Sequence, residues 1–165
     1  MRTKEKLSQN ITYTEATKSD TAIKFGIDNT PNALQLANMR SIAENIFQPI
    51  RHKFRVPIGI TSFFRSEKLN TKIGGSKTSQ HCTGEAMDID ADVYGMVSNR
   101  EIFNYIKNYL SFDQLIWEFG SDSEPAWVHV SFKRIGHNRG QVLRAIKEKN
   151  WQGRLVTKYI IYDGK

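Results

Sequence analysis

The sequence predicts an α+β domain in which a small antiparallel sheet is flanked by helices. Three observations support this class: a long segment with apolar residues at helical spacing, a shorter helical segment with its own capping signals, and four short segments in which apolar and polar side chains alternate. The 165 residues contain no internal repeat, and this length suits one domain. We therefore expect residues 1–165 to form a single domain, with residues 1–10 as a loose leader and residues 133–165 as a basic C-terminal segment.

The first two helices are predicted from capping signals and periodicity. Residues 14–27 are predicted to form a short helix. Residues 31–53 are predicted to form the longest helix, because Thr30 suits the N-cap and Pro31 suits the first helical position. Pro49 lies inside this helix, and we expect a disturbance there.

A third helix is predicted over residues 98–111, where Ser98 is the N-cap and Glu101 completes a capping box. The pattern is weaker toward the C-terminus. Residues 141–149 fit either a helix or an edge strand, and residues 155–163 fit a strand.

Four strands are predicted over residues 58–65, 86–90, 113–119 and 127–132. Because successive side chains of a strand point to opposite faces of the sheet, each segment has one apolar face for a core. The opposite faces carry the ionisable side chains of Arg65, Asp88, Glu118 and His129. If the strands share one sheet, these four side chains line one surface, although the alternation does not reveal the strand order.

The positive charge of the chain is concentrated at its C-terminal end. The net charge is +7, from 24 Lys and Arg against 17 Asp and Glu. Residues 133–165 hold nine of the basic and two of the acidic residues, so the first 132 residues are neutral. Such a segment suits a polyanionic partner, namely cell-wall polymer, lipid head groups or nucleic acid, or else it is a solvated face.

The composition also excludes some classes of protein. There is no run of 18 apolar residues, so we expect no membrane span. The first residues are charged and polar, so we expect no secretory signal peptide. The single cysteine, Cys82, excludes an internal disulfide, and we interpret it as a packed small residue rather than a metal ligand.

The stretch "SQHCTGEAMDID", residues 79–90, places His81 seven residues before Asp88. In a regular helix, positions at this separation lie roughly 10 Å apart along the axis. Two ligands of one metal ion must each lie within ~2.0–2.2 Å of it. If these residues meet, the chain between them must turn back, and Gly84 suits such a turn.

A set of two histidines and one carboxylate is formed by His81, Asp88 and His129. Three protein ligands with one open position are the pattern of a catalytic zinc site. The remaining histidines, His52 and His137, are interpreted as ordinary packed or exposed residues.

The chain resembles the zinc D-Ala-D-Ala metallopeptidase family, whose members are D,D-carboxypeptidases, D-Ala-D-Ala dipeptidases and L-Ala-D-Glu endopeptidases acting on peptidoglycan. The family motif S-x-H-x-x-G-x-A-x-D is matched by "SQHCTGEAMD", and the second motif, Trp-x-His, by "WVHVS". Further similarity, over roughly residues 12–132, lies in "GIDNTP", "QPIR", "TSFFRSEKLN" and "GGSKTSQH". The first two of these segments resemble the branch common in phages and prophages.

The resemblance implies a fold shared with the Hedgehog signalling domain and one Zn²⁺ per chain, held by His81, Asp88 and His129. It also implies that Arg65 binds a carboxylate or carbonyl oxygen of the substrate and that Ser79 forms a hydrogen bond with the substrate. The alternatives without a role in substrate binding are that Arg65 forms a surface ion pair and that the Ser79 hydroxyl only stabilises a turn.

The sequence departs from the family at the catalytic acid. Several members carry this acid three residues before the second histidine, where this chain has Ala126. Peptide hydrolysis needs a group that takes a proton from water and passes it to the leaving amine. Glu118 is the better candidate because it lies on the polar face of its strand, and Glu124 in the following turn is the alternative. Asp90 shares a face with Asp88 and is either an orienting partner of a ligand or a solvated strand end.

The resemblance therefore implies a zinc metallopeptidase that hydrolyses peptide bonds in peptidoglycan stem peptides, as single-domain phage lysis enzymes do. We expect a monomer that is made in the cytoplasm and reaches the cell wall or periplasm through a holin or within a phage particle. The alternative is a non-enzymatic module that keeps its zinc for structure and binds anionic wall polymer or a phage structural partner. Nucleic-acid binding through the basic segment rests on charge alone and is the weaker hypothesis.

Overall fold

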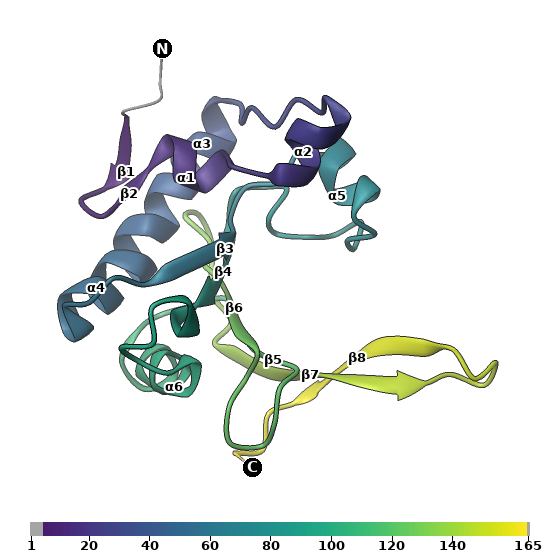
Figure 1. The fold of residues 1–165 in the computed structure, drawn as a ribbon. Helices are drawn as coiled ribbons and strands as arrows, with labels where there is room; N and C mark the ends of the chain where they lie inside the picture. Colours follow the sequence, from purple (N-terminus) through teal and green to yellow (C-terminus); the bar gives the residue numbers. More distant parts are fainter. Residues whose placement is uncertain (1–4, 165) are drawn as a thin grey trace.

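The computed structural model describes residues 5–164, which form a six-stranded sheet with helices around it (Figure 1). The strands of this sheet are β3 (Gly59–Ser62), β4 (Ala86–Asp90), β5 (Gln114–Glu118), β6 (Trp127–Ser131), β7 (Gln141–Lys149) and β8 (Leu155–Ile161). Their spatial order is β3-β4-β6-β5-β7-β8, and all neighbours are antiparallel except β5 and β7. The predicted α+β class with a small, mainly antiparallel sheet is confirmed.

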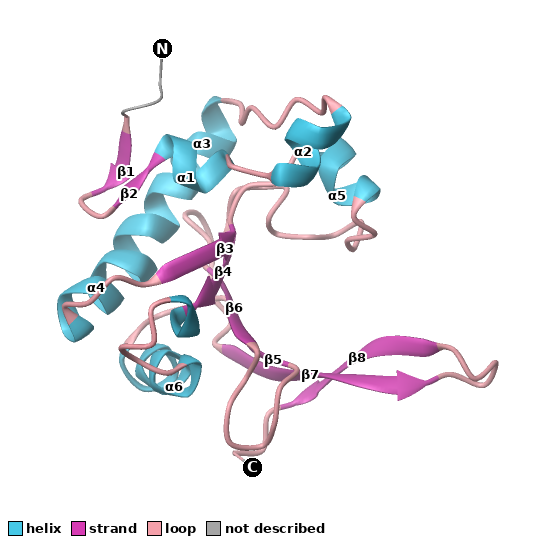
Figure 2. Cartoon of the chain, in the orientation of Figure 1, coloured by secondary structure: helices cyan, strands magenta, loops and turns pink. Residues whose placement is uncertain are grey.

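The other elements precede or connect these strands. They are β1 (Lys6–Ser8), β2 (Ile11–Thr12), α1 (Tyr13–Thr17), α2 (Asp20–Phe25), α3 (Ala33–Ile42), η1 (Ala43–Phe47), α4 (Gln48–Phe54), α5 (Glu67–Lys72), η2 (Ala91–Val93) and α6 (Asn99–Tyr109). Figure 2 shows that β7 and β8 extend away from the helices as a long hairpin. Across residues 5–164, no helix has the length and apolar character needed to cross a membrane.

The N-terminal part is more regular than the sequence indicated. β1 and β2 form an antiparallel pair and Leu7 is buried, so the expectation of a loose leader over residues 1–10 is wrong for its described part. Residues 1–4 lie outside the described residues. The helix expected over residues 14–27 is divided into α1 and α2, because the Ser19 hydroxyl caps a new helix start.

The longest helix follows its prediction with two differences. It runs through α3, η1 and α4, and its N-cap is Asn32 rather than Thr30, because Asn32 and Gln35 exchange cap hydrogen bonds. Its middle segment, η1, is a π-helical turn next to Pro49. Proline lacks an N–H and crowds the carbonyl four residues earlier, so the wider turn accommodates it.

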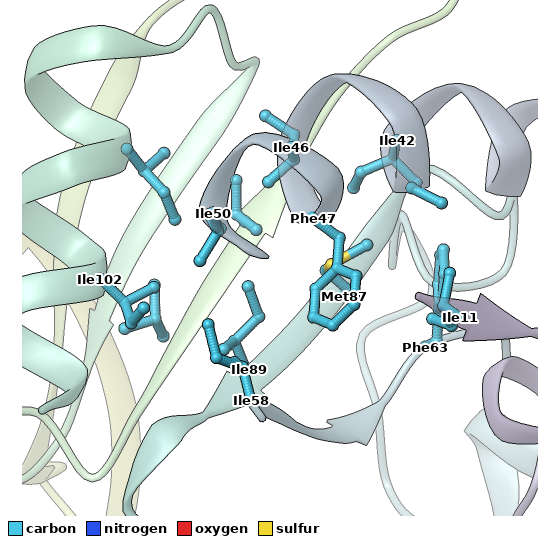
Figure 3. Close-up of a cluster of buried hydrophobic side chains, with 14 of the residues drawn as sticks. Ile11, Ile42, Ile46, Phe47, Ile50, Ile58, Phe63, Met87, Ile89 and Ile102 are labelled. Carbon is cyan, nitrogen blue, oxygen red and sulfur yellow. The ribbon is translucent and has the colours of Figure 1, made fainter. Parts of the chain in front are cut away.

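The core lies between one face of the sheet and the helices that cover it (Figure 3). Its side chains include Ile42, Ile46, Phe47 and Ile50 from the long helix, Met87 and Ile89 from β4, and Ile102 from α6, each at most 2% exposed. Burial of one such side chain is worth about 1.5–3 kcal/mol. Helix α6 begins with the predicted capping box of Ser98 and Glu101. Because the apolar side chains occupy this face, the polar side chains of the same strands point to the other.

The open question at the C-terminus, whether residues 141–149 form a helix or a strand, is answered by β7, and the strand predicted after it is β8. Residues 141–149 form a strand rather than a helix, and β8 pairs with it as the outermost strand of the sheet. The basic residues of this region are partly neutralised by acids. Within the described residues, ion pairs join Lys133 and Arg139 to Asp113, Arg144 to Asp122, and Lys158 to Glu148.

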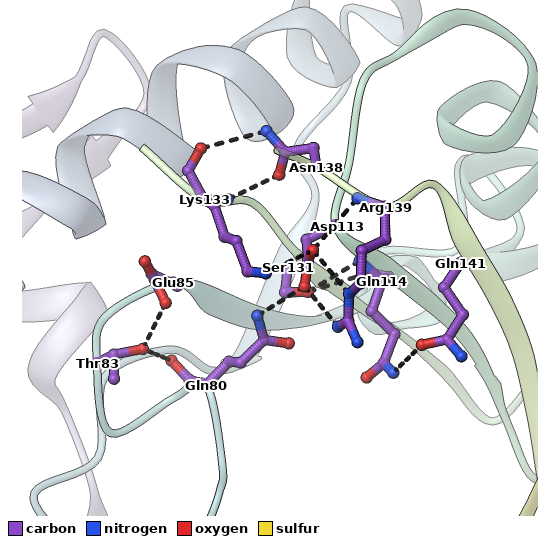
Figure 4. A network of polar contacts seen from close by, with 10 residues as sticks. All are labelled: Gln80, Thr83, Glu85, Asp113, Gln114, Ser131, Lys133, Asn138, Arg139 and Gln141. Atoms are coloured by element: carbon purple, nitrogen blue, oxygen red, sulfur yellow. Dashed lines mark hydrogen bonds and ion pairs between the residues drawn. The ribbon is translucent and has the colours of Figure 1, made fainter. Parts of the chain in front are cut away.

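A buried carboxylate ties the segment between β6 and β7 to the rest of the domain (Figure 4). Asp113 accepts hydrogen bonds from the Arg139 guanidinium at 2.6 and 2.9 Å and from the Gln80 amide at 3.0 Å. Burial alone would raise the pKa of Asp113, but the donors of Arg139, Gln80 and Lys133 outweigh it and hold the pKa below its ordinary value. The residue therefore connects the loop before β4 with the start of β5 and the approach to β7.

Candidate metal centre and active-site cleft

The polar face of the sheet brings together residues from neighbouring strands. In β4 and β6, Asp88 lies opposite His129, and His129 in turn lies opposite Ile116 of β5. Glu118 follows two positions later in β5, on the same face as Ile116. The alternation seen in the sequence thus places Asp88, Glu118 and His129 around one cleft.

His81 reaches this face from the loop before β4 because that loop turns back. The Gly84 N–H donates to the His81 carbonyl at 3.3 Å, and Gly84 has a φ of +76°. A Cβ at Gly84 would lie 2.5 Å from the backbone oxygen of Gln35 in α3, so glycine is required there. Side chains of α3 also hold the loop, since Gln35 and Asn38 donate to the carbonyls of Cys82 and Thr83.

Three potential ligand atoms form a small triangle. The distances are 3.3 Å from His81 Nε2 to Asp88 Oδ1, 2.8 Å from His129 Nδ1 to Asp88 Oδ1, and 3.3 Å from His81 Nε2 to His129 Nδ1. In a tetrahedral zinc site with bonds of ~2.0–2.1 Å, two ligand atoms are about 3.3–3.4 Å apart. Two of the three distances match this spacing and the third is about 0.5 Å shorter, so the three atoms lie close enough together to bind one ion.

The surroundings also set the protonation states of His81 and Asp88. His81 Nδ1 lies 2.6 Å from the Phe63 carbonyl, which accepts its N–H and leaves Nε2 as the free lone pair of the ring. Burial lowers the pKa of His81, so the ring is kept neutral, as a ligand must be. Burial opposes ionisation of Asp88, yet His81 and His129 outweigh it and hold the pKa of Asp88 below its ordinary range.

Glu118 stands beside this triangle with an unusual environment. Glu118 is 6% exposed, and its Oε2 atom has no hydrogen-bond partner among the described residues. Burial raises the pKa of Glu118 from 4.5 to about 7, with His129 lowering it and Asp88 raising it further. A carboxyl group with a pKa near neutrality can both accept and return a proton.

Arg65 and Ser79 also line the cleft. The Arg65 Nη2 lies 3.6 Å from Asp88 Oδ2, and the Arg65 Nε is buried without a partner in the described part of the chain. The backbone of Arg65 donates to the His81 carbonyl at 3.3 Å, which ties the two segments together. Ser79 lies in the turn before His81, where its carbonyl accepts the Cys82 N–H at 3.0 Å.

Glu124, the alternative candidate for the catalytic acid, and Asp90, the candidate orienting partner, both lie outside the cleft lining. Glu124 accepts the backbone N–H of Arg100 at 2.8 Å and so caps the start of α6. Asp90 accepts from the Asn99 side chain and from the Asp92 backbone, and these contacts give it a role at the strand end rather than beside a ligand histidine.

The remaining candidates stay outside the cluster as well. The group of His, Cys, Asp and Glu side chains that could hold one ion is formed, within the described residues, by His81, Asp88 and His129 without Cys82. The side chain of His52 lies on α4, where its Nε2 is 3.0 Å from the Gln48 amide.

A family comparison adds to this geometry. The profile described as peptidase M15 matches residues 9–131, which is most of the chain. The chain belongs to the peptidase M15 family. The matched span agrees with the region over which the sequence resembles zinc metallopeptidases, and both histidines and the aspartate lie inside it. A search of curated proteins found no match.

In this M15 chain the cleft has walls that the sequence motifs did not reveal. The cleft has a volume of about 580 Å³, and its lining includes Phe119 and Trp127 together with Leu143, Lys147, Thr157 and Tyr159. The last four residues lie on β7 and β8, beyond the matched span. Their alternate positions along β7 and β8 could have predicted from the sequence that they share a face of the sheet. Only the pairing of β7 with β5 shows that this face borders the cleft.

Proposed function

We propose that this chain is a zinc-dependent peptidase that hydrolyses peptide bonds in peptidoglycan stem peptides. The observation that carries the proposal is the ligand triangle with an unpaired, buried carboxyl group beside it. Membership of the peptidase M15 family supports the reaction class. The close approach of the three ligand atoms supports one Zn²⁺ per chain, bound by His81, Asp88 and His129.

When bound, zinc would polarise the scissile carbonyl and lower the pKa of water to ~7. In this proposal Glu118 takes the proton from the attacking water and passes it to the leaving amine. Burial raises the pKa of Glu118 to about 7 in the metal-free protein, so the surroundings of this carboxyl group favour uptake of a proton. Glu118 thereby fills the role that Ala126 cannot perform.

Arg65 and Ser79 are proposed to hold the substrate. The Arg65 guanidinium has five N–H donors in a planar fork, and its contact with one Asp88 oxygen leaves donors for a substrate carboxylate or carbonyl oxygen. The Ser79 hydroxyl lies in the cleft lining and can donate one further hydrogen bond.

Release of a phage or remodelling of the wall is the biological setting that we propose, and the resemblance to the phage branch supports it. The chain would act as a monomer at the cell wall or in the periplasm, reached through a holin or within a phage particle. The basic segment 133–165 would add contacts to anionic wall polymer through the charges that are not paired within the domain.

The test is digestion of purified peptidoglycan with zinc and, in parallel, with a chelator, followed by mass analysis of the released muropeptides. New stem-peptide termini that depend on zinc would support the peptidase and identify the bond that is cut. If zinc-loaded protein binds the wall but releases no new termini, the chain is instead a non-enzymatic binding module. The second function is supported by Ala126, which occupies the position of the catalytic acid in several family members and cannot transfer a proton.

A further inference from the structure

The hairpin of β7 and β8 forms one wall of the cleft, although it lies beyond the residues that match the family profile. The registers explain how it does so. In the parallel pair, Ile116 of β5 lies opposite Leu143 and Glu118 opposite Ala145. The same face therefore continues from the candidate metal centre onto β7, where the next position is Lys147.

The register of the hairpin adds two residues of β8 to this face. Thr157 lies opposite Lys147, and Tyr159 lies opposite Ala145. All of these except Ala145 line the cleft. The face thus runs without interruption from β4 to β8, and its outer part is supplied by the hairpin (Figure 1).

Lys147 is held at this wall by two contacts that leave its charge available. Its Nζ donates to Thr157 Oγ1 at 2.9 Å and lies 4.8 Å from the centre of the Phe119 ring. An ammonium group has three donors, so this hydrogen bond leaves two of them. Among the described residues, no ion pair joins Lys147 to a carboxylate, whereas its hairpin neighbour Lys158 is paired with Glu148.

Phe119 supports this placement through an unusual backbone conformation. It has a φ of +52°, a region that side chains bearing a Cβ rarely adopt. Its N–H donates to the Ala145 carbonyl at 3.1 Å, and its ring packs against Trp127 with centroids 5.3 Å apart. The ring consequently stays at the cleft wall, under the Lys147 ammonium. Strained residues of this kind gather at functional sites.

The charges of the cleft indicate what Lys147 would bind. The floor contains the carboxyl group of Glu118, which disfavours an anion directly beside it, and Arg65, which is proposed above to bind a substrate oxygen next to the metal centre. Lys147 lies on the strand next to Glu118, two positions beyond the residue opposite Glu118. The Cα atoms of the two residues are therefore roughly 8 Å apart, which is about the length of two residues of extended peptide. Arg65 and Lys147 are the Arg and Lys residues of the cleft lining, and Lys147 is the one on the hairpin side. An anionic group on a substrate residue that extends toward the hairpin would therefore meet Lys147.

We propose that Lys147, positioned by Thr157 and Phe119, binds a carboxylate of a substrate residue close to the scissile bond. The hairpin then makes the cleft prefer stem peptides with a free carboxylate over those in which the same group is a carboxamide. Because this subsite serves the peptidase activity proposed above, it stands only if that activity does.

The test uses two synthetic stem peptides that differ only in whether the acidic residue is a carboxylate or a carboxamide. We expect zinc-loaded parent protein to prefer the carboxylate by about three- to tenfold in kcat/KM, the range for a partly solvated charge-assisted contact. Lys147→Met should abolish the preference, chiefly through a higher KM for the carboxylate peptide. Lys147→Arg should retain part of it, because the charge remains.

The matched control is Lys149→Met, which removes the same charge from the same face of β7, two residues closer to the hairpin tip and outside the cleft lining. This variant should keep the preference of the parent. Zinc content and thermal unfolding of all variants should match the parent, which excludes misfolding as the cause.

The outcomes separate the two proposals. A parent that cleaves both peptides equally well, or a Lys147→Met variant that keeps the preference, overturns the subsite while the peptidase stands. Loss of preference in Lys149→Met to the same degree would also overturn it, because bulk charge would then explain the effect. A zinc-loaded parent that cleaves neither peptide overturns the peptidase and the subsite with it.

Discussion

Replacing Glu118 with glutamine should have opposite effects on catalysis and on stability. Glutamine keeps the size of the side chain but cannot accept the proton of the attacking water. Loss of a general base typically costs ~10²–10⁴-fold in rate. Zinc should remain bound, because Glu118 is proposed as a neighbour of the ligands and not as one of them.

The stability effect follows from the raised pKa. Folding moves the pKa of Glu118 from 4.5 to about 7, because burial disfavours the charged form. At 1.36 kcal/mol for each tenfold change in the proton equilibrium, this corresponds to about 3 kcal/mol. The native state binds this proton more tightly than the unfolded state, so the cost is absent below pH 4.5, grows between pH 4.5 and about 7, and is complete above that range.

Metal-free Glu118→Gln protein should therefore be more stable than metal-free parent by up to about 3 kcal/mol at pH 8, and nearly equal to it at pH 4. Urea unfolding at both pH values measures this difference, and hydrolysis of peptidoglycan with zinc measures the rate. Metal-free protein is needed for the first assay because a nearby cation would change the pKa of the carboxyl group.

The control is Glu124→Gln, which keeps an oxygen that can accept the Arg100 N–H and lies outside the cleft. It should change neither the rate nor the stability by much. If Glu124→Gln is inactive while Glu118→Gln is active, the base lies in the turn and the assignment from strand alternation fails. If Glu118→Gln is inactive but no more stable at pH 8 than the parent, the carboxyl group is not buried in the way described.

Three further expectations concern other parts of the molecule. His81→Ala should lose most of its bound zinc in metal analysis, and full retention would place the ion elsewhere. Binding of the protein to insoluble wall through residues 133–165 should weaken with salt, because the Debye length falls from ~8 Å at physiological ionic strength to ~3 Å at 1 M; a pull-down that is unaffected by salt would remove this role. Asp113→Asn should lower the free energy of unfolding by about 1–3 kcal/mol at pH 7, because it weakens the hydrogen bonds from Arg139. Since the pKa of Asp113 is depressed on folding, the parent should lose this stabilisation as pH falls below ~3.9, and the variant should show less of that acid dependence in urea titrations.

Features that depend on neighbouring residues could be predicted from the sequence. The capping box of Ser98 and Glu101 is such a feature, because the cap and its partner lie three residues apart. The turn that joins His81 to Asp88 is another, since the distance limits of metal coordination and the presence of Gly84 required it. Strand alternation likewise assigned Asp88 and His129 to the polar face before any pairing was known.

Competition between similar local signals was harder to resolve. Thr30 and Asn32 both suit an N-cap, and the choice fell to Asn32 because Gln35 is placed to complete the reciprocal hydrogen bonds. The disturbance expected at Pro49 was correct in place, but its form as a π-helical turn depends on how the helix packs over the sheet.

Alternation along the chain determined which side chains of each strand share a face, because that period is a property of the backbone. It left open which strands are neighbours, since hydrogen bonds between strands join residues far apart in sequence. The parallel pairing of β5 with β7 is decided by such contacts, supported by the Arg139 bonds to Asp113 that guide the chain into β7. That single pairing carries Lys147, Thr157 and Tyr159 to the cleft, because side chains from distant segments meet only after the strand order is set by packing.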